Sequence, residues 1–73
     1  MKVYGMNYWR HPYTRVICCC RSKREFASLV GDSLYHVRRF ACETYNDEEI
    51  AFATKHPNKI ILKKDDGTMK VKE

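Results

Sequence analysis

The chain has 73 residues, a net charge of +5 and a hydrophobic fraction of 44%. This length is enough for one domain, residues 1–73, with a modest core, because a chain of this size buries only about 60% of its unfolded surface. Residues 1–20 contain no apolar run of signal-peptide length, and no stretch approaches about 18 apolar residues, as a membrane span would. We therefore expect a single cytoplasmic domain that does not contact the membrane.

The charges are distributed unevenly along the chain. Residues 1–40 carry a net charge of +6, residues 41–54 a net −4 and residues 55–73 a net +3. This distribution suits a surface that binds a polyanion, with an acidic patch elsewhere. A small protein also carries net charge for solubility, so charge alone does not decide the partner.

The first predicted elements are two strands. Residues 1–9 are rich in aromatic side chains and indicate a strand. Pro12 then favours an extended or turn conformation in the residue before it. Residues 14–20 form a β-branched, mostly apolar run, which predicts a strand buried on both faces. The two strands can pair as an N-terminal β-hairpin.

Two helices are predicted next. Ser22 with Glu25 three residues later is a capping box, so we expect a helix over 23–30. Gly31 ends this helix, because glycine readily takes the left-handed conformation found after helices. Ser33 is expected to cap a second helix, over 34–42.

The last part of the chain predicts a helix and a hairpin. Asn46 with Glu49 three residues later repeats the capping box, which favours a helix over 47–55. Strands are expected over 59–64 and 69–72, joined at an Asp-Gly turn that tolerates positive φ. The order strand, strand, three helices, strand, strand gives an α+β fold with a β-hairpin at each end.

The four cysteines favour a structural role. Cys18, Cys19 and Cys20 are consecutive, and Cys42 stands alone. Cys18 and Cys20 share one face of a strand and are able, with Cys42 and a histidine, to surround zinc. The absence of a C-x2-C pair favours the other interpretation, small apolar residues in a buried strand. We expect no metal and no cofactor.

The segment 23–42, KREFASLVGDSLYHVRRFAC, carries the most specific pattern. A helix-turn-helix unit has a small residue on its first helix, a glycine at the turn and inward apolar residues on both helices. The segment resembles the helix-turn-helix of phage repressors and Cro-like regulators. The matching positions, all expected to face inward or form the turn, are Phe26, Ala27, Val30, Gly31, Val37 and Phe40. Asp32 departs from the pattern, and a predicted β-hairpin stands where repressors have a preceding helix.

The resemblance implies a small, non-enzymatic DNA-binding regulator of phage or mobile-element type, working in the cytoplasm of the host cell. Its second helix would enter the major groove of duplex DNA, where arginine pairs with guanine, while serine and tyrosine serve the phosphates. The implied DNA-contacting residues on and before the two helices are Arg21, Lys23, Arg24, Ser33, Tyr35, Arg38 and Arg39, with Leu34 on the same outward side. Such proteins often bind as homodimers.

The C-terminal hairpin extends the resemblance to winged helix-turn-helix proteins. A basic hairpin after the two helices would act as the wing and contact phosphates. It adds Lys63, Lys64 and Lys70 to the implied DNA contacts, with Lys72 nearby. Lysines also protect edge strands from aggregation, and the sequence does not separate these two roles.

Two other binding functions stay open. Tyr8, Trp9 and Tyr13 are candidate interface residues of a small phage-like inhibitor that binds a host protein, such as a defence nuclease or a polymerase, because aromatic side chains concentrate interface energy. The acidic segment 43–49 is an alternative interface. The same aromatics, together with Tyr4, suit the stacking of single-stranded bases. They also suit packing over a small core.

Catalysis is not expected. His11, His36 and His56 are scattered along the chain, and none falls in a recognised catalytic signature. The three glycines are too far apart to form a phosphate-binding loop.

Overall fold

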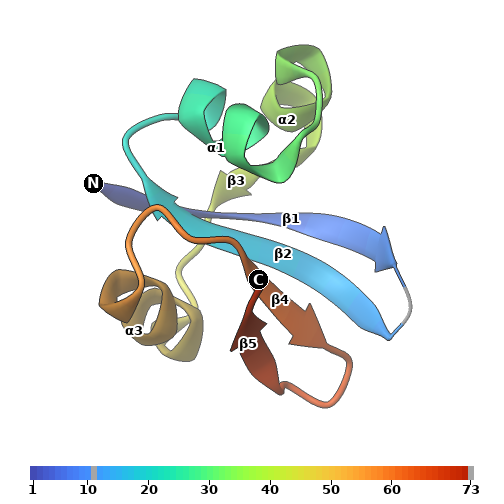
Figure 1. The fold of residues 1–73 in the computed structure, drawn as a ribbon, viewed down its shortest axis with the longest axis vertical. Coiled ribbons are helices and arrows are strands. Elements are labelled where there is room, and N and C mark those ends of the chain that lie inside the picture. The colour runs from blue at the N-terminus through green and yellow to red at the C-terminus, as the bar shows by residue number, and fades with distance from the viewer. Residues whose placement is uncertain (11, 73) are drawn as a thin grey trace.

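The computed structural model describes residues 1–10 and 12–72, apart from the side chains of Tyr8 and Trp9. It confirms the α+β fold, with helices between strands at both ends of the chain (Figure 1). In chain order the elements are β1 (Lys2–Arg10), β2 (Tyr13–Cys20), α1 (Lys23–Val30), α2 (Leu34–Phe40), β3 (Cys42–Glu43), α3 (Asp47–Lys55), β4 (Ile61–Lys64) and β5 (Met69–Val71).

The strands form one antiparallel sheet in the order β3-β1-β2-β4-β5. The two predicted hairpins are therefore not separate, because β2 pairs with β4 and joins them, with Ile17 opposite Ile61. Helices α1 and α2 cover one face of the sheet and α3 covers the other (Figure 1). The domain thus has three layers, with a core on each side of the sheet.

Strand β2 supplies both cores, as its apolar sequence predicts. Val16, Cys18 and Cys20 face α1 and α2, while Ile17 and Cys19 face α3. All five side chains are buried, because alternate residues of a strand point to opposite faces. Burial raises the pKa of the Cys18 thiol to about 12, so this thiol stays protonated and behaves as a small apolar group.

The turn between α1 and α2 forms as the sequence predicts. The Ser22 hydroxyl caps α1 by accepting a hydrogen bond from the backbone N–H of Glu25 at 3.2 Å. Gly31 ends the helix in the left-handed conformation, with φ of 79°. The Ser33 hydroxyl then caps α2 by accepting from the N–H of His36 at 3.1 Å. Three residues therefore separate the two helices.

The end of α2 differs from the prediction. The helix ends at Phe40 rather than Cys42, because the chain turns to an extended conformation at Ala41 and pairs Cys42 with Gly5 at the edge of the sheet. Ala41 is 3% exposed and packs in the core, whereas Phe40, predicted to face inward, is 55% exposed. The pairing of Cys42 with the sheet edge thus ends the helix early, and Phe40 remains on the exposed side of α2.

Helix α3 holds a buried carboxylate. Asn46 caps the helix by accepting from the Glu49 N–H at 3.0 Å, as predicted. The Glu49 side chain does not complete the capping box. It is directed into the protein, where it accepts hydrogen bonds from Thr44 Oγ1 at 2.6 Å, Lys63 Nζ at 2.8 Å and Arg15 Nε at 3.0 Å. Glu49 therefore ties α3 to strands β2 and β4.

Candidate nucleic-acid interface

Helix α2 projects from the protein and packs along one side only. Val37 is its buried residue, and Leu34 packs partly against the core shared with α1 and β1. Leu34 was predicted to face outward and instead helps to seat the helix. Tyr35 is 74% exposed and Phe40 55% exposed. Most of the circumference of α2 is therefore open to a partner.

Arg38 and Arg39 lie on this open side, as predicted. They line a shallow surface pocket with Tyr35. The Arg39 guanidinium donates to the Tyr35 hydroxyl at 3.5 Å, and its Cζ lies 5.7 Å from the centre of the Phe40 ring. Within residues 1–10 and 12–72 no carboxylate forms an ion pair with either arginine. Both charges are accordingly presented to solvent.

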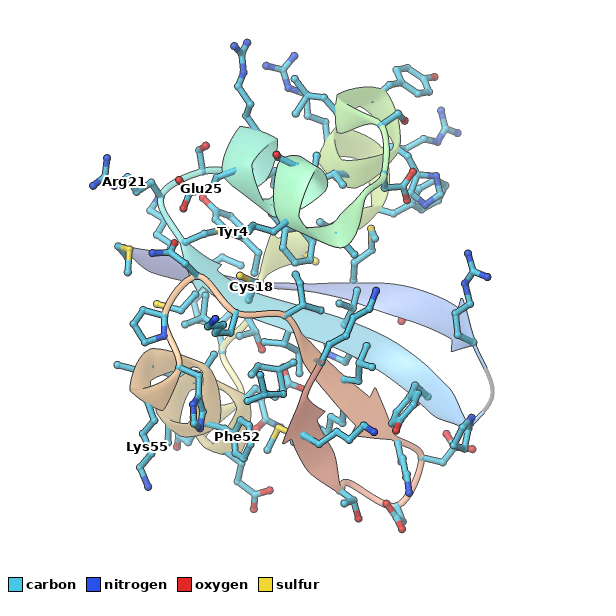
Figure 2. The ribbon with its side chains drawn as sticks, viewed as in Figure 1. Tyr4, Cys18, Arg21, Glu25, Phe52 and Lys55 are labelled. Atoms are coloured by element: carbon cyan, nitrogen blue, oxygen red, sulfur yellow. The ribbon has the colours of Figure 1, made fainter. Side chains whose placement is uncertain are left out.

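The predicted basic residues before and within α1 lie at the start of that helix. Arg21 and Arg24 are exposed and Lys23 is half-exposed. Figure 2 shows Arg21 extending away from the protein, beside Glu25. The Glu25 carboxylate accepts a hydrogen bond from the Arg21 backbone N–H at 3.2 Å, while the Arg21 side chain is exposed. The structure thus places a second group of cations on the same two-helix unit.

The turn residues carry different roles. Ser33, a predicted phosphate contact, is exposed, but its oxygen caps α2. Asp32, the departure from the repressor pattern, accepts from the Ser33 N–H at 2.7 Å and lies 3.6 Å from His36 Nε2. Asp32 therefore stabilises the start of α2, where a carboxylate is favoured by the free N–H groups.

The β4–β5 hairpin does not stand beside α2 as a wing would. It forms the edge of the sheet opposite β3, whereas α2 contacts α1 and β1. Lys63, a predicted DNA contact, is only 18% exposed at its side chain and is bound to Glu49. The ammonium groups of Lys64 and Lys70 lie 5.9 and 5.4 Å from the centre of the Tyr13 ring. These lysines form a group separate from Arg38 and Arg39.

The aromatic cluster of the first two strands is divided. Tyr4 is 8% exposed and packs with Phe26 in the core, so it does not offer a stacking surface. Figure 2 shows Tyr4 between the sheet and α1. Tyr13 is half-buried against the same core. The predicted interface side chains of Tyr8 and Trp9 lie outside the described part of the structure.

The other described residues that could bind a metal ion or act in catalysis do not form a cluster. Among the described residues, no group of three His, Cys, Asp or Glu side chains is placed to hold a metal ion. His56 stacks on Phe52, with ring centres 5.2 Å apart, and His11 lies outside the described residues.

In the described ranges, no helix has the length and apolar character needed to cross a membrane. Searches of protein-family models, curated proteins and solved structures find no match to this chain.

Proposed function

We propose that this protein binds duplex DNA through α1 and α2, with the outer side of α2 directed into the major groove. The function is binding rather than catalysis, in the manner of small regulators of the repressor type. Such a protein works in the cytoplasm of its cell, or of the host cell if it is phage-encoded.

The observation that carries this proposal is the exposure of Arg38 and Arg39 on a helix that touches the protein by one side. A helix enters the major groove only if most of its circumference is free of its own protein, because the groove encloses it. Helix α2 meets this requirement, and its two arginines are not neutralised by a described carboxylate. Arg21 and Arg24 add positive charge at the start of α1.

The test is a fluorescence anisotropy titration of duplex DNA over a series of salt concentrations. The wild-type protein should bind, with log affinity falling against log salt at a slope of about −4 to −5 for about five neutralised phosphates. The Arg38→Ala/Arg39→Ala variant should lose most of this binding while keeping its melting temperature, because both side chains are exposed.

The matched control is Lys55→Glu, which lowers the net charge by the same two units at a site outside α1 and α2. Lys55 extends from α3, away from α1 and α2 (Figure 2). This control should bind nearly as the wild type does. Absence of wild-type binding at low salt, or equal loss in the two variants, contradicts the proposal.

A second candidate function is binding to a protein. The specific observation is the exposed pair Tyr35 and Phe40, which flank Arg39 on the same helix. Tyrosine and arginine are enriched in the energetic centres of protein interfaces. Phe40→Ala separates the candidates: it should weaken capture of a protein partner strongly and leave DNA affinity within about threefold of the wild type.

A further inference from the structure

A shallow groove lies between α3 and the start of β1. We call it the α3 groove and define it by Met1, Val3, Ile50, Thr54 and Pro57, which are among its lining residues. Its volume is about 460 Å³, which is room for an aromatic ring. Val3 and Ile50 belong to the core on the α3 side of the sheet. The floor of the groove is therefore a margin of that core which α3 leaves uncovered.

One end of the α3 groove is acidic. Asp47 lies three residues before Ile50, so the two side chains are neighbours on the same side of α3. Glu48 follows Asp47, and both carboxylates are exposed, with no ion pair to a cation among the described residues. Lys2, which also lines the groove, lies 3.8 Å from the Glu43 carboxylate and is paired with it. The acidic end, Asp47 and Glu48, is thus free to receive a cation.

The outer side of α2 carries the complementary features. Phe40 is 55% exposed, and the exposed Arg38 and Arg39 precede it. The Arg39 Cζ lies 5.7 Å from the centre of the Phe40 ring, so the ring and the guanidinium are presented together. Apolar surface is more stable out of water, so an apolar groove with an acidic end suits this combination of a ring and two cations.

Phe40 does not reach the α3 groove of its own chain. Helices α1 and α2 cover one face of the sheet, and α3 and the groove lie on the other (Figure 1). The two surfaces are therefore able to meet only between two molecules. A contact between different surfaces of identical chains leaves one of each surface unused, so it repeats from copy to copy.

We propose that Phe40 of one copy inserts into the α3 groove of a second copy. In this contact Arg38 and Arg39 lie beside the acidic end of the groove, and the opposite charges guide the approach. The proposal rests on the second candidate function, protein binding, and names the partner as another copy of this chain. It differs from the homodimer that the resemblance implies, since a symmetric dimer joins the same surface of both copies. Because it uses the outer side of α2, it excludes DNA binding by the same helix.

The first test is sedimentation velocity of the full chain at concentrations up to about 1 mM, which reveals weak contacts of small area. The average mass of the wild type should rise above the 8.7 kDa of one chain. Phe40→Ala should stay monomeric, because loss of a central aromatic side chain weakens a contact about thirtyfold or more. Thr54→Arg should also stay monomeric, since it places a long cation in the groove. Thr68→Arg is the matched control: it makes the same change between β4 and β5, outside the groove, and should associate as the wild type does.

Mixing the two monomeric variants gives a gain of binding that misfolding does not imitate. Phe40→Ala keeps an open groove, and Thr54→Arg keeps the exposed ring. An equal mixture therefore restores one contact, and no further copy is able to add to the pair. The mixture should form a species of twice the 8.7 kDa chain mass and nothing larger.

Three results would contradict the proposal: a wild type that is monomeric throughout the series, association that persists in both variants, or a mixture that stays monomeric. Capture of a different protein through Phe40 by a monomeric wild type would assign this surface to that protein and reject the second copy. None of these samples contains DNA, so their failure does not affect the anisotropy test of duplex binding.

Discussion

Glu49 shows how one buried charge organises the α3 side of the sheet. Its side chain is 3% exposed, and two cations and one hydroxyl satisfy it. Burial alone raises the pKa of a carboxyl group, but the hydrogen bonds from Lys63, Thr44 and Arg15 outweigh burial and hold the pKa of Glu49 below its ordinary value. The group therefore stays ionised in the folded protein at neutral pH.

Replacing Glu49 with glutamine should destabilise the protein by about 3 kcal/mol. This change leaves Arg15 and Lys63 without their carboxylate, and breaking a buried pair on one side costs about 3–5 kcal/mol. The lower end applies because both cations keep some exposure, 28% and 18% at their side chains. Urea denaturation would measure the loss. A change under about 0.5 kcal/mol would contradict the role given to this network.

Gly5 makes room for the same network. A Cβ at this position would collide with the Arg15 guanidinium, which would have to shift and so disturb its hydrogen bonds to Glu49. We expect Gly5→Ala to cost about 1.5–3 kcal/mol, as for a lost hydrogen bond to a charged group. In an Arg15→Met background the same change should cost little. A double-mutant cycle measures this coupling, and strict additivity would contradict it.

Gly31 is required for its backbone rather than for space. A Cβ there meets no atom within 4 Å, but φ is 79°. Gly31→Val should therefore lose about 1–2 kcal/mol of stability from conformation alone. Gly31→Asn is the control, because asparagine tolerates the left-handed region. Equal melting temperatures for the two variants would show that the turn does not depend on this conformation.

At the scale of elements, the sequence was most informative where local chemistry decides the structure. The caps at Ser22, Ser33 and Asn46 and the left-handed Gly31 follow from contacts within four residues, and all are confirmed. The end of α2 depends instead on pairing between Cys42 and Gly5, which lie far apart in the chain. The periodicity of neighbouring residues gives no information on that pairing. The predicted helix is therefore too long, and the prediction that Phe40 faces the core is wrong.

The same distinction between local and long-range contacts applies to the candidate site. The exposure of Arg38 and Arg39 could be predicted, because it follows from helix periodicity around Val37. The burial of Lys63 could not be predicted, because it depends on an ion pair with Glu49, which lies on α3. One signal for that network was present in the sequence: Arg15 alternates with Ile17 and Cys19, so it had to face the α3 side of the sheet.

At the scale of the whole molecule, acid should unfold the protein through Glu49. Its pKa is lower in the folded than in the unfolded chain, so protonation favours unfolding. The stability that it contributes is present above the ordinary value of 4.5 and is lost as pH falls towards the lower folded value. Thermal melts between pH 7 and 3 should show the wild type losing stability below about pH 4.5. The Glu49→Gln variant should show a weaker dependence over the same range.

The pairing of β2 with β4 has a consequence for how the chain folds. Strand β1 pairs with β2, and α1 packs against α2, so the contacts between elements that follow one another in the chain close short loops. The pairings of Gly5 with Cys42 and of Val16 with Leu62 both close much longer loops, at a higher entropic cost. The β1–β2 hairpin and the two helices should thus form before β3 and β4 join the sheet, and amide protons of β4 should become protected from hydrogen exchange later than those that pair β1 with β2. The proposed DNA-binding helices would then take shape while the far edge of the sheet is still unpaired.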